Sequence, residues 1–383
     1  MKKKKIKILI FTGTRAEYGI MSSLIDDIDK DKHLELSLLV SGSHLSPEFG
    51  ETYKEIENDG KKIDEKVEII LSSDTPIGVS KSVGLGLISY SESLARIKPN
   101  LVIILGDRFE ALAMAQVCTF SDIPIMHLHG GEKSEGAFDD SLRHAITKLS
   151  HFHCTSCDVY KNRVLQLGEP SRFVRNFGAL SIDNFRRSQL LSKAATLKKL
   201  KLNNDDPFML ITYHPATLGE DPVLAIDNLL DVLKDYSDYN FIFTYPNADQ
   251  GGRKIISKIN NFISKNNTNS FAFESLGHQL FLSSLKHSEC IIGNSSSGII
   301  EAPSLKVPTL DIGERQKGRV CADSVVHCKP NKKSIKINLD KIISNKHNMS
   351  YLNPYQKANT SLNILKFIKS IDLNYRKKFV DFK

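Results

Sequence analysis

The sequence contains no tryptophan, and only 6 of its 383 residues are cysteine. Six irregularly spaced cysteines in a chain of this length do not form the disulfide framework of a small secreted protein, and they fit a reducing compartment. Cys154 and Cys157 form a C-x-x-C pair close to His151 and His153, but no second pair of ligands stands at zinc-finger spacing. The pattern therefore favours a strand running into a helix over a metal site.

Long apolar runs are also missing. No stretch approaches the roughly 20 apolar residues that a membrane-spanning helix needs. The basic start Lys2–Lys5 and the apolar run Ile6–Phe11 resemble a signal peptide, but Lys7 interrupts the run and no small-residue cleavage site follows. We therefore expect a soluble, cytoplasmic protein with no membrane partner.

The charge balance has a formal net value of +8, from 52 Lys and Arg against 44 Asp and Glu. Such an excess would suit an anionic partner such as a nucleotide. Much of it lies at the chain ends, in Lys2–Lys5 and in Arg376, Lys377, Lys378 and Lys383. Because no motif combines aromatic and basic residues, we expect no nucleic-acid partner.

The length and the order of the apolar segments predict two domains. Short apolar runs alternate with helical patterns up to Phe177, and the same rhythm restarts at Phe208. We expect an α/β fold of two Rossmann-like, doubly wound domains that face a central cleft. The expected parts are an N-terminal domain 1–180, a charged linker 181–206, a C-terminal domain 207–360 and a terminal helix 361–383. The terminal helix can pack back on the first domain. The last expected strand is Pro308–Ile312, and the terminal helix is expected from Ser361 to Phe379.

The run HLHGGEKSEGAFDDSLR, residues 127–143, gathers more titratable groups than any other segment. It follows an apolar strand, passes a Gly-Gly turn and reaches an Asp-Asp-Ser pattern that can cap a helix carrying Arg143. The carboxyl ends of strands are where open α/β sheets bind ligands, so His129, Glu132 and Asp139 are candidates for acid and base chemistry. The alternative is a solvated loop with ordinary helix caps.

Asp107, in the run GDRFE, follows another apolar strand and should lie at the same sheet edge as His129. It could be an ordinary helix cap. However, carboxyl groups that lie close together push their pKa values apart, so that one holds a proton while another accepts one. The convergence of Asp107, Glu132 and Asp139 therefore favours a catalytic role.

The first strand-to-helix turn, FTGTRAE, places Arg15 where it can meet a diphosphate. The turn is neither G-x-G-x-x-G nor a P-loop, so the fingerprint of a bound dinucleotide is absent. An ion pair of Arg15 with Glu17, or a solvated Arg15, is the alternative.

Two motifs of the second half predict the rest of the site. The run TYHP ends an apolar strand and presents His214. The run GNSSSGIIEAP offers N–H groups and hydroxyls of Ser295, Ser296 and Ser297 to phosphate oxygens, with Glu301 at the reach of a ribose diol. Arg315 follows the next strand and adds positive charge, unless it belongs to a solvated basic face.

Several motifs, in order over most of the chain, resemble those of the hydrolysing UDP-N-acetylglucosamine 2-epimerases, and most closely the bacterial sialic-acid-pathway branch. They are GTRAEYG, LGDRFEALA, HLHGGE, DDSLRHAITKLSH, YHP, YPNADQGG and GNSSSGIIEAPSLKVPTLDIGERQKGR. The resemblance implies the two-domain fold of the glycosyltransferase-B type. It also implies conversion of UDP-N-acetylglucosamine and water to UDP and N-acetylmannosamine, without a cofactor or an essential metal, by a homodimer or homotetramer.

The resemblance also assigns roles by position. Asp107, Asp139 and His214 match catalytic residues of the family, and Glu132 and His129 are added as catalytic candidates. The UDP contacts are matched by Arg15, Phe281, Ser295, Ser296, Ser297 and Glu301, and Arg143, Asn247 and Arg315 are further candidates. Two departures stand out, because many members have Glu where His129 stands and some have Lys where Ile20 stands.

The chemistry explains why such groups are needed. The C2 hydrogen of an N-acetyl sugar is not next to a carbonyl, so it becomes removable only as UDP leaves C1 and positive charge develops. The product is a glycal with a C1–C2 double bond, to which water adds with inverted configuration at C2. Such a site needs cations for the diphosphate and an acid and a base near the sugar.

Three alternatives remain open from the sequence. A UDP-2,4-diacetamido-trideoxy sugar of a legionaminic-type pathway could replace UDP-N-acetylglucosamine as the substrate. A glycosyltransferase of the same architecture would need a sugar acceptor, and a nucleotide-sugar sensor would bind UDP without turnover.

Overall fold

The computed structural model describes residues 5–71, 75–133, 139–187, 189–202, 207–215, 222–246, 252–266 and 268–381. The chain divides into two compact units. The first combines residues 1–132 and 138–184 with residues 357–383, and the second is built mainly from residues 185–356.

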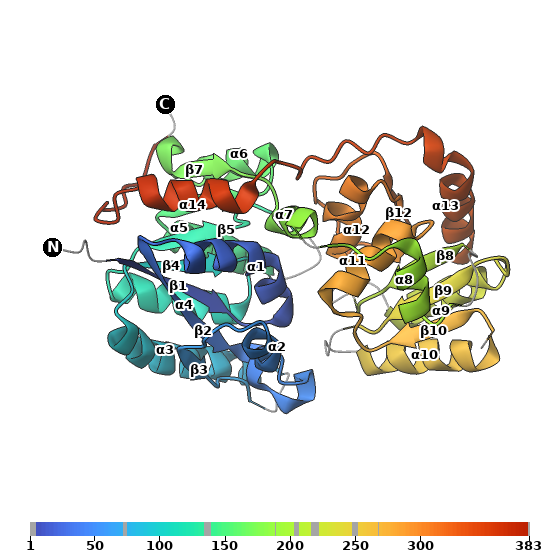
Figure 1. The fold of residues 1–383 in the computed structure, drawn as a ribbon, viewed down its shortest axis with the longest axis horizontal. Helices are drawn as coiled ribbons and strands as arrows, with labels where there is room; N and C mark the ends of the chain where they lie inside the picture. The colour runs from blue at the N-terminus through green and yellow to red at the C-terminus, as the bar shows by residue number, and fades with distance from the viewer. Residues whose placement is uncertain are drawn as a thin grey trace. The chain divides into compact units, whose positions relative to one another are not determined.

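The first unit contains a seven-stranded sheet in the order β3-β2-β1-β4-β5-β6-β7 (Figure 1). Its strands are β1 (Ile6–Thr12), β2 (Leu34–Ser41), β3 (Glu65–Val67), β4 (Leu101–Leu105), β5 (Ile125–Leu128), β6 (Phe152–Thr155) and β7 (Val174–Asn176). All of their pairings are parallel. The turns after β1, β4 and β5 therefore leave the sheet at one edge, where α/β sheets bind ligands.

Helices cover both faces of this sheet, because alternate residues of a strand point to opposite sides and both sides are apolar. Ile8 and Ile10 pack with α1 (Arg15–Lys30) and α14 (Thr360–Ser370). Leu9 and Phe11 pack on the other side with α3 (Pro76–Ile97) and α4 (Phe109–Phe120). The unit also contains α2 (Tyr53–Asn58), α5 (Asp139–Leu149), α6 (Asp158–Gln166) and the start of α7 (Leu180–Arg187), up to Asn184.

The second unit repeats the plan with a parallel sheet in the order β10-β9-β8-β11-β12-β13. Its strands are β8 (Phe208–Thr212), β9 (Asn240–Thr244), β10 (Ser270–Phe273), β11 (Ile291–Gly293), β12 (Thr309–Ile312) and β13 (Val325–Cys328). Met209 and Ile211 face α9 (Pro222–Leu233), α10 (Gly252–Lys265) and α13 (Lys332–Asn345). Phe208 and Leu210 face α8 (Lys193–Lys199) and α11 (Gly277–His287).

The predicted fold class is confirmed, since both sheets are parallel, doubly wound and reverse their order beside the first strand. Strand β13 was not predicted, because VVHC is only four residues long and contains a polar histidine. The segment expected to be a linker contains α8, and its Leu197 and Leu200 enter the second core.

The terminal helix is shorter than predicted. It ends at Ser370 instead of Phe379, and Asp372 accepts a hydrogen bond from the backbone N–H of Asn374 at 3.0 Å. Such a local side-chain bond competes with helix continuation. Figure 1 shows α14 alongside the first sheet, where it packs against α1. No helix in the described part of the chain is long and apolar enough to cross a bilayer.

Candidate active site

Asp107 and Arg143 connect the two candidate segments of the first unit. Gly106 leaves β4 with φ of +75° and leads into Asp107, whose carboxylate contacts the guanidinium of Arg143 on α5. Arg143 is 1% exposed, and its Nη1 donates to Asp140 Oδ1 and to the carbonyl of Glu132, both at 2.9 Å. A buried guanidinium requires such partners. Arg143 therefore fixes the turn after β4, the start of α5 and the loop after β5 to one another.

His129 and Glu132 form a second buried pair. His129 Nδ1 lies 3.2 Å from Glu132 Oε1, which also accepts a hydrogen bond from Ser156 Oγ at 2.9 Å. The backbone of His129 has φ of +61°, a left-handed conformation that costs a non-glycine residue energy. No described residue forms a hydrogen bond with His129 Nε2. A strained, buried imidazole beside a carboxylate is a candidate for acid and base chemistry.

The two glycines of the HGGE motif permit this packing. A Cβ on Gly130 would lie 2.9 Å from His127 Nδ1, and a Cβ on Gly131 would lie 2.5 Å from the carbonyl oxygen of Tyr160. Gly131 also has φ of +78°. The turn therefore needs glycine at both positions to bring Glu132 beneath His129.

His127 has a supporting role and does not line the ligand edge. Its ring is fully buried, with Nε2 2.7 Å from the carbonyl of Gly106 and Nδ1 3.1 Å from Thr147 Oγ1. A carbonyl only accepts, so Nε2 of this ring carries the proton. Burial lowers the pKa of His127 to about 3, which keeps it neutral. His127 therefore supports Gly106, the residue before Asp107.

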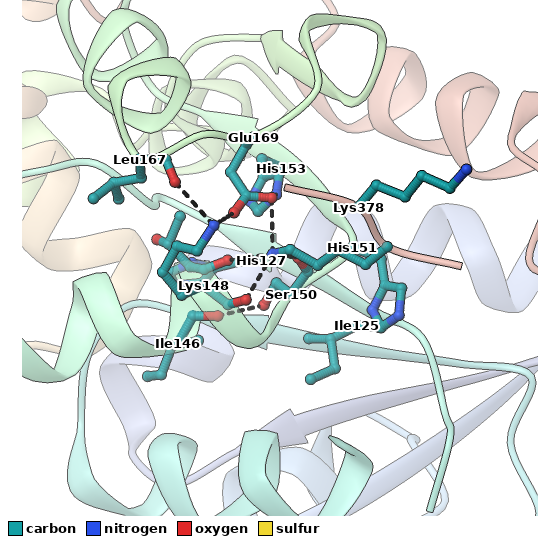
Figure 2. A network of polar contacts seen from close by, with 12 residues as sticks. Ile125, His127, Ile146, Lys148, Ser150, His151, His153, Leu167, Glu169 and Lys378 are labelled. Atoms are coloured by element: carbon teal, nitrogen blue, oxygen red, sulfur yellow. Dashed lines mark hydrogen bonds and ion pairs between the residues drawn. The ribbon is translucent and has the colours of Figure 1, made fainter. Parts of the chain in front are cut away.

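A buried ion network anchors the far end of α5 (Figure 2). Glu169 Oε1 lies 2.7 Å from Lys148 Nζ, and its Oε2 lies 3.0 Å from His153 Nε2 and 2.8 Å from Lys377 Nζ. Lys377 also donates to the carbonyl of Lys148 at 2.7 Å. Burial alone would raise the pKa of Glu169, but its three partners hold it at about 2. The helix that begins at Asp139 and carries Arg143 is thus held at both ends.

Arg15 is the first residue of α1, at the turn that follows β1. Thr14 caps the helix by accepting a hydrogen bond from the N–H of Glu17 at 3.3 Å. The side chain of Arg15 is 43% exposed, with Nη1 3.9 Å from Glu55 Oε1. Some members of the family that the motifs resemble have lysine at the position of Ile20. In this chain Ile20 packs against the first core.

His214 belongs to the second unit, where Asn294 holds its backbone. Asn294 Oδ1 accepts from the N–H of His214 at 2.7 Å, and Asn294 Nδ2 donates to the carbonyl of His214 at 2.8 Å. The carbonyl of Asn294 accepts from Arg315 Nη1 and Gln316 Nε2, both at 2.9 Å. The sequence analysis did not single out Asn294 and Gln316, although they lie within the motifs GNSSS and ERQKG. Burial, with repulsion from Arg315, lowers the pKa of His214 to about 3, so the ring is neutral.

The serine turn follows β11 through Gly293, whose φ is +140°. A Cβ there would lie 2.0 Å from the carbonyl oxygen of Thr212. Ser295 then caps α12 (Ser296–Ile300) by accepting from the N–H of Ser297 at 3.3 Å. Ser295, Ser296 and Ser297 are all partly exposed, whereas Glu301 at the end of α12 is buried. The turn can offer hydroxyls and N–H groups to an anion.

The remaining candidates are less constrained. Phe281 on α11 is partly buried against the second core, and Asn247 lies outside the described residues. Cys154 and Cys157 are buried free thiols. Within the described ranges, no group of three or more His, Cys, Asp and Glu side chains is arranged to hold a metal ion.

A family profile and individual relatives both match most of this chain. A profile of the family described as UDP-N-acetylglucosamine 2-epimerase matches residues 26–369. A GDP/UDP-N,N'-diacetylbacillosamine 2-epimerase (hydrolyzing) from Campylobacter jejuni is 43% identical over 323 residues, 84% of each chain. The polysialic acid biosynthesis protein P7 of Escherichia coli is 36% identical over 98% of this chain and 97% of its own.

Solved structures share the fold. The UDP-GlcNAc 2-epimerase from Neisseria meningitidis, solved with UDP-GlcNAc, matches with a TM-score of 0.80 at 19% identity, covering 96% of this chain and 100% of that one. At that identity the likeness concerns the fold alone, and it agrees with the two doubly wound sheets.

Proposed function

Because the chain belongs to the UDP-N-acetylglucosamine 2-epimerase family, we propose that it hydrolyses a UDP-linked 2-acetamido sugar and inverts the configuration at C2. The observation that carries the proposal is the buried chain of contacts from Asp107 through Arg143 to Glu132 and His129. It gathers carboxyl and imidazole groups at the carboxyl edge of the first sheet, where acid and base catalysis needs them.

We assign the sugar chemistry mainly to the first unit. The C1–O bond to UDP breaks while a base takes the C2 proton, which gives the 2-acetamidoglucal. Water then adds its oxygen to C1, and an acid returns a proton to the opposite face of C2. Asp107, Asp139 and the His129–Glu132 pair supply these groups, and we propose that this pair replaces the glutamate that many members have at the position of His129.

We assign UDP binding mainly to the second unit. Ser295, Ser296 and Ser297 offer hydroxyl and N–H donors to the diphosphate, and Arg315 beside Asn294 adds positive charge. Glu301 is assigned to the ribose, Phe281 to the base, and Arg15 of the first unit to the diphosphate. His214, the further catalytic candidate, is neutral at pH 7, so its ring can donate and accept hydrogen bonds without adding charge.

Two substrates are candidates. UDP-N-acetylglucosamine would give N-acetylmannosamine for sialic acid biosynthesis, in keeping with the polysialic acid protein at 36% identity. The UDP-2,4-diacetamido-2,4,6-trideoxy sugar is favoured by the Campylobacter jejuni relative at 43% identity, whose name specifies N,N'-diacetylbacillosamine. The two sugars differ at C4 and C6. A glycosyltransferase would instead require a sugar acceptor for turnover.

The test is incubation with each substrate in heavy water. We expect UDP release together with a 2-epimerised product that carries deuterium at C2. Release of UDP without that label, or turnover only with an added sugar acceptor, would contradict the proposal. The assay is repeated with His129→Ala and with Glu132→Gln. The residue that exchanges the C2 proton is the one whose substitution stops formation of the deuterated product.

We further propose a cytoplasmic homodimer or homotetramer. The six cysteines are free thiols, which suits a reducing compartment. On α3, Ile77 and Ile88 are 68% and 63% exposed, which makes this helix a candidate for the subunit interface. Ile88→Lys should reduce the oligomer mass in light scattering. An unchanged mass would exclude α3 from the interface.

A further inference from the structure

Glu17 is a buried carboxyl group that the proposed chemistry does not use. Its side chain lies directly beneath the turn that carries Arg15, and its Oε2 accepts a hydrogen bond from the N–H of Gly13 at 2.6 Å. A Cβ built on Gly13 would meet Glu17 Oε2 at 3.5 Å and Glu110 Cβ at 3.6 Å. Glu17 and Glu110 therefore flank the turn between β1 and α1.

The turn that follows β2 packs against the same two residues, Gly13 and Glu110. Gly42 follows β2 with φ of +60°, and a Cβ there would lie 2.6 Å from the carbonyl oxygen of Gly13 and 2.9 Å from Glu110 Oε1. Arg108 Nε lies 3.3 Å from Glu110 Oε2. Three strand ends are thus packed against one another around two buried carboxyl groups and the guanidinium of Arg108.

The charges around Glu17 compensate its own charge only in part. Arg108 attracts its ionised form, but that guanidinium is already paired with Glu110, whose charge repels Glu17. Tyr90 from α3 stays neutral, because burial raises its pKa, and burial lowers the pKa of His44 to about 4. Burial foremost, then Glu110, raise the pKa of Glu17 to about 7, while Arg108 and the N–H groups of Gly13 and Thr14 oppose the rise.

We propose that Glu17 is a positioning residue that couples its own protonation to binding of the UDP diphosphate at the turn Gly13–Arg15. The inference rests on the proposed function, since it needs a diphosphate at Arg15. A diphosphate brings negative charge close to Glu17, and an ionised Glu17 beside Glu110 would repel it. The protonated carboxyl removes this repulsion and still accepts the N–H of Gly13 through its carbonyl oxygen. Proton uptake by Glu17 and diphosphate binding therefore favour each other.

The kinetic test is the pH dependence of KM and kcat between about pH 5.5 and 9. The diphosphate of a UDP-sugar is a diester with no group that titrates in this range, so a rise of KM reports on the protein. We expect KM of the wild type to increase up to about tenfold per pH unit above about pH 7. Glu17→Gln is neutral and can still accept the N–H of Gly13, so its KM should lose this rise.

A matched control is Glu55→Gln, which removes the exposed carboxylate 3.9 Å from Arg15 and should keep the rise of KM with pH. The same slope in Glu17→Gln as in the wild type would overturn the inference and leave the proposed function intact. A complete lack of turnover by the wild type on both sugars would instead remove the proposed function.

A second readout needs no turnover. In protein labelled with ¹³C at glutamate side-chain carboxyls, the wild type should show one glutamate that titrates near pH 7. That signal should be missing in Glu17→Gln. If no glutamate of the wild type titrates near pH 7, the inference is overturned whatever the kinetics show.

Discussion

Arg143 is the residue on which the other candidates of the first unit depend. Its buried guanidinium contacts Asp107, Asp140 and the carbonyl of Glu132. Removing one partner of a buried charge leaves the other partner desolvated and unpaired, which costs several kcal/mol. Asp107 therefore combines a chemical role with a structural one, and the two roles have to be separated by comparison with Asp140.

Asp107→Asn should lower turnover by about 10²- to 10⁴-fold, because an amide can neither accept nor return a proton. Asp140→Asn perturbs the same guanidinium and is the matched control. We expect similar losses of unfolding free energy in denaturant titrations of the two variants, with the large loss of UDP release confined to Asp107→Asn. Equal losses of turnover would show that Asp107 acts only by holding Arg143.

Gly293 shows how a single missing side chain shapes the second half of the site. Gly293→Ala would place a Cβ 2.0 Å from the carbonyl oxygen of Thr212 at a φ of +140°. We expect destabilisation by at least about 2 kcal/mol, from strain and forced displacement of β8. The control is Gly84→Ala on α3, where a Cβ meets no atom within 4 Å and alanine favours the helix by roughly 0.5–1 kcal/mol. Melting temperatures that fall equally in both variants would contradict this account.

At the scale of elements, α5 is the helix that joins the site to the rest of the first unit. Arg143 fixes its first turns, and Lys148 and Lys377 meet Glu169 at its other end. Residues 371–381, which follow α14 and which we expected to be helical as far as Phe379, instead form an irregular segment that carries Lys377 to this end of α5. The extension beyond α14 thereby contributes to holding the candidate catalytic helix.

The pH dependence of stability tests this anchor. The pKa of Glu169 in the folded chain is about 2, below its ordinary value of 4.5. A lowered carboxyl pKa stabilises the fold above the ordinary value, and this contribution is lost as pH falls from about 4.5 toward 2. The melting temperature of the wild type should therefore fall steeply in this range. Glu169→Gln should be less stable at neutral pH and fall less steeply, whereas parallel curves would exclude a contribution of this group.

At the scale of the whole molecule, the chain builds two hydrophobic cores, and its last helix belongs to the first of them. Ile364 and Ile368 of α14 are 1% exposed and pack with residues of β1 and α1. Segments from both ends of the chain thus complete one unit. A chain that lacks residues 357–383 therefore leaves that core open, while the second core keeps all of its strands.

Deletion of residues 357–383 should lower the stability of the first unit selectively. Burial of the apolar side chains of α14 contributes several kcal/mol, at roughly 1.5–3 kcal/mol for each large residue. In hydrogen exchange, β1 and α1 should lose protection, while β8 and β9 of the second unit keep it. Equal loss of protection in both units would show that the two cores unfold as one.

The sequence by itself determined the two doubly wound sheets. Buried parallel strands need continuous apolar runs such as Ile6–Phe11 and Leu101–Leu105, and these runs carry a local signal. It also located the motifs after β4, β5 and β11, because the carboxyl ends of parallel strands converge. Strand β13 was missed because VVHC has too little apolar signal, and the terminal helix was extended too far because its apolar spacing continues beyond Ser370.

Only the tertiary structure decided how each candidate is held. His127 and His129 look equivalent in the motif HLH, yet one supports Gly106 from the core and the other meets Glu132. Asn294, Gln316 and Glu17 gained their roles from partners far away in sequence or from burial that no local pattern records. The physical reason is that hydrogen-bond partners and desolvation depend on segments brought together by folding, whereas strand and turn signals reside in neighbouring residues.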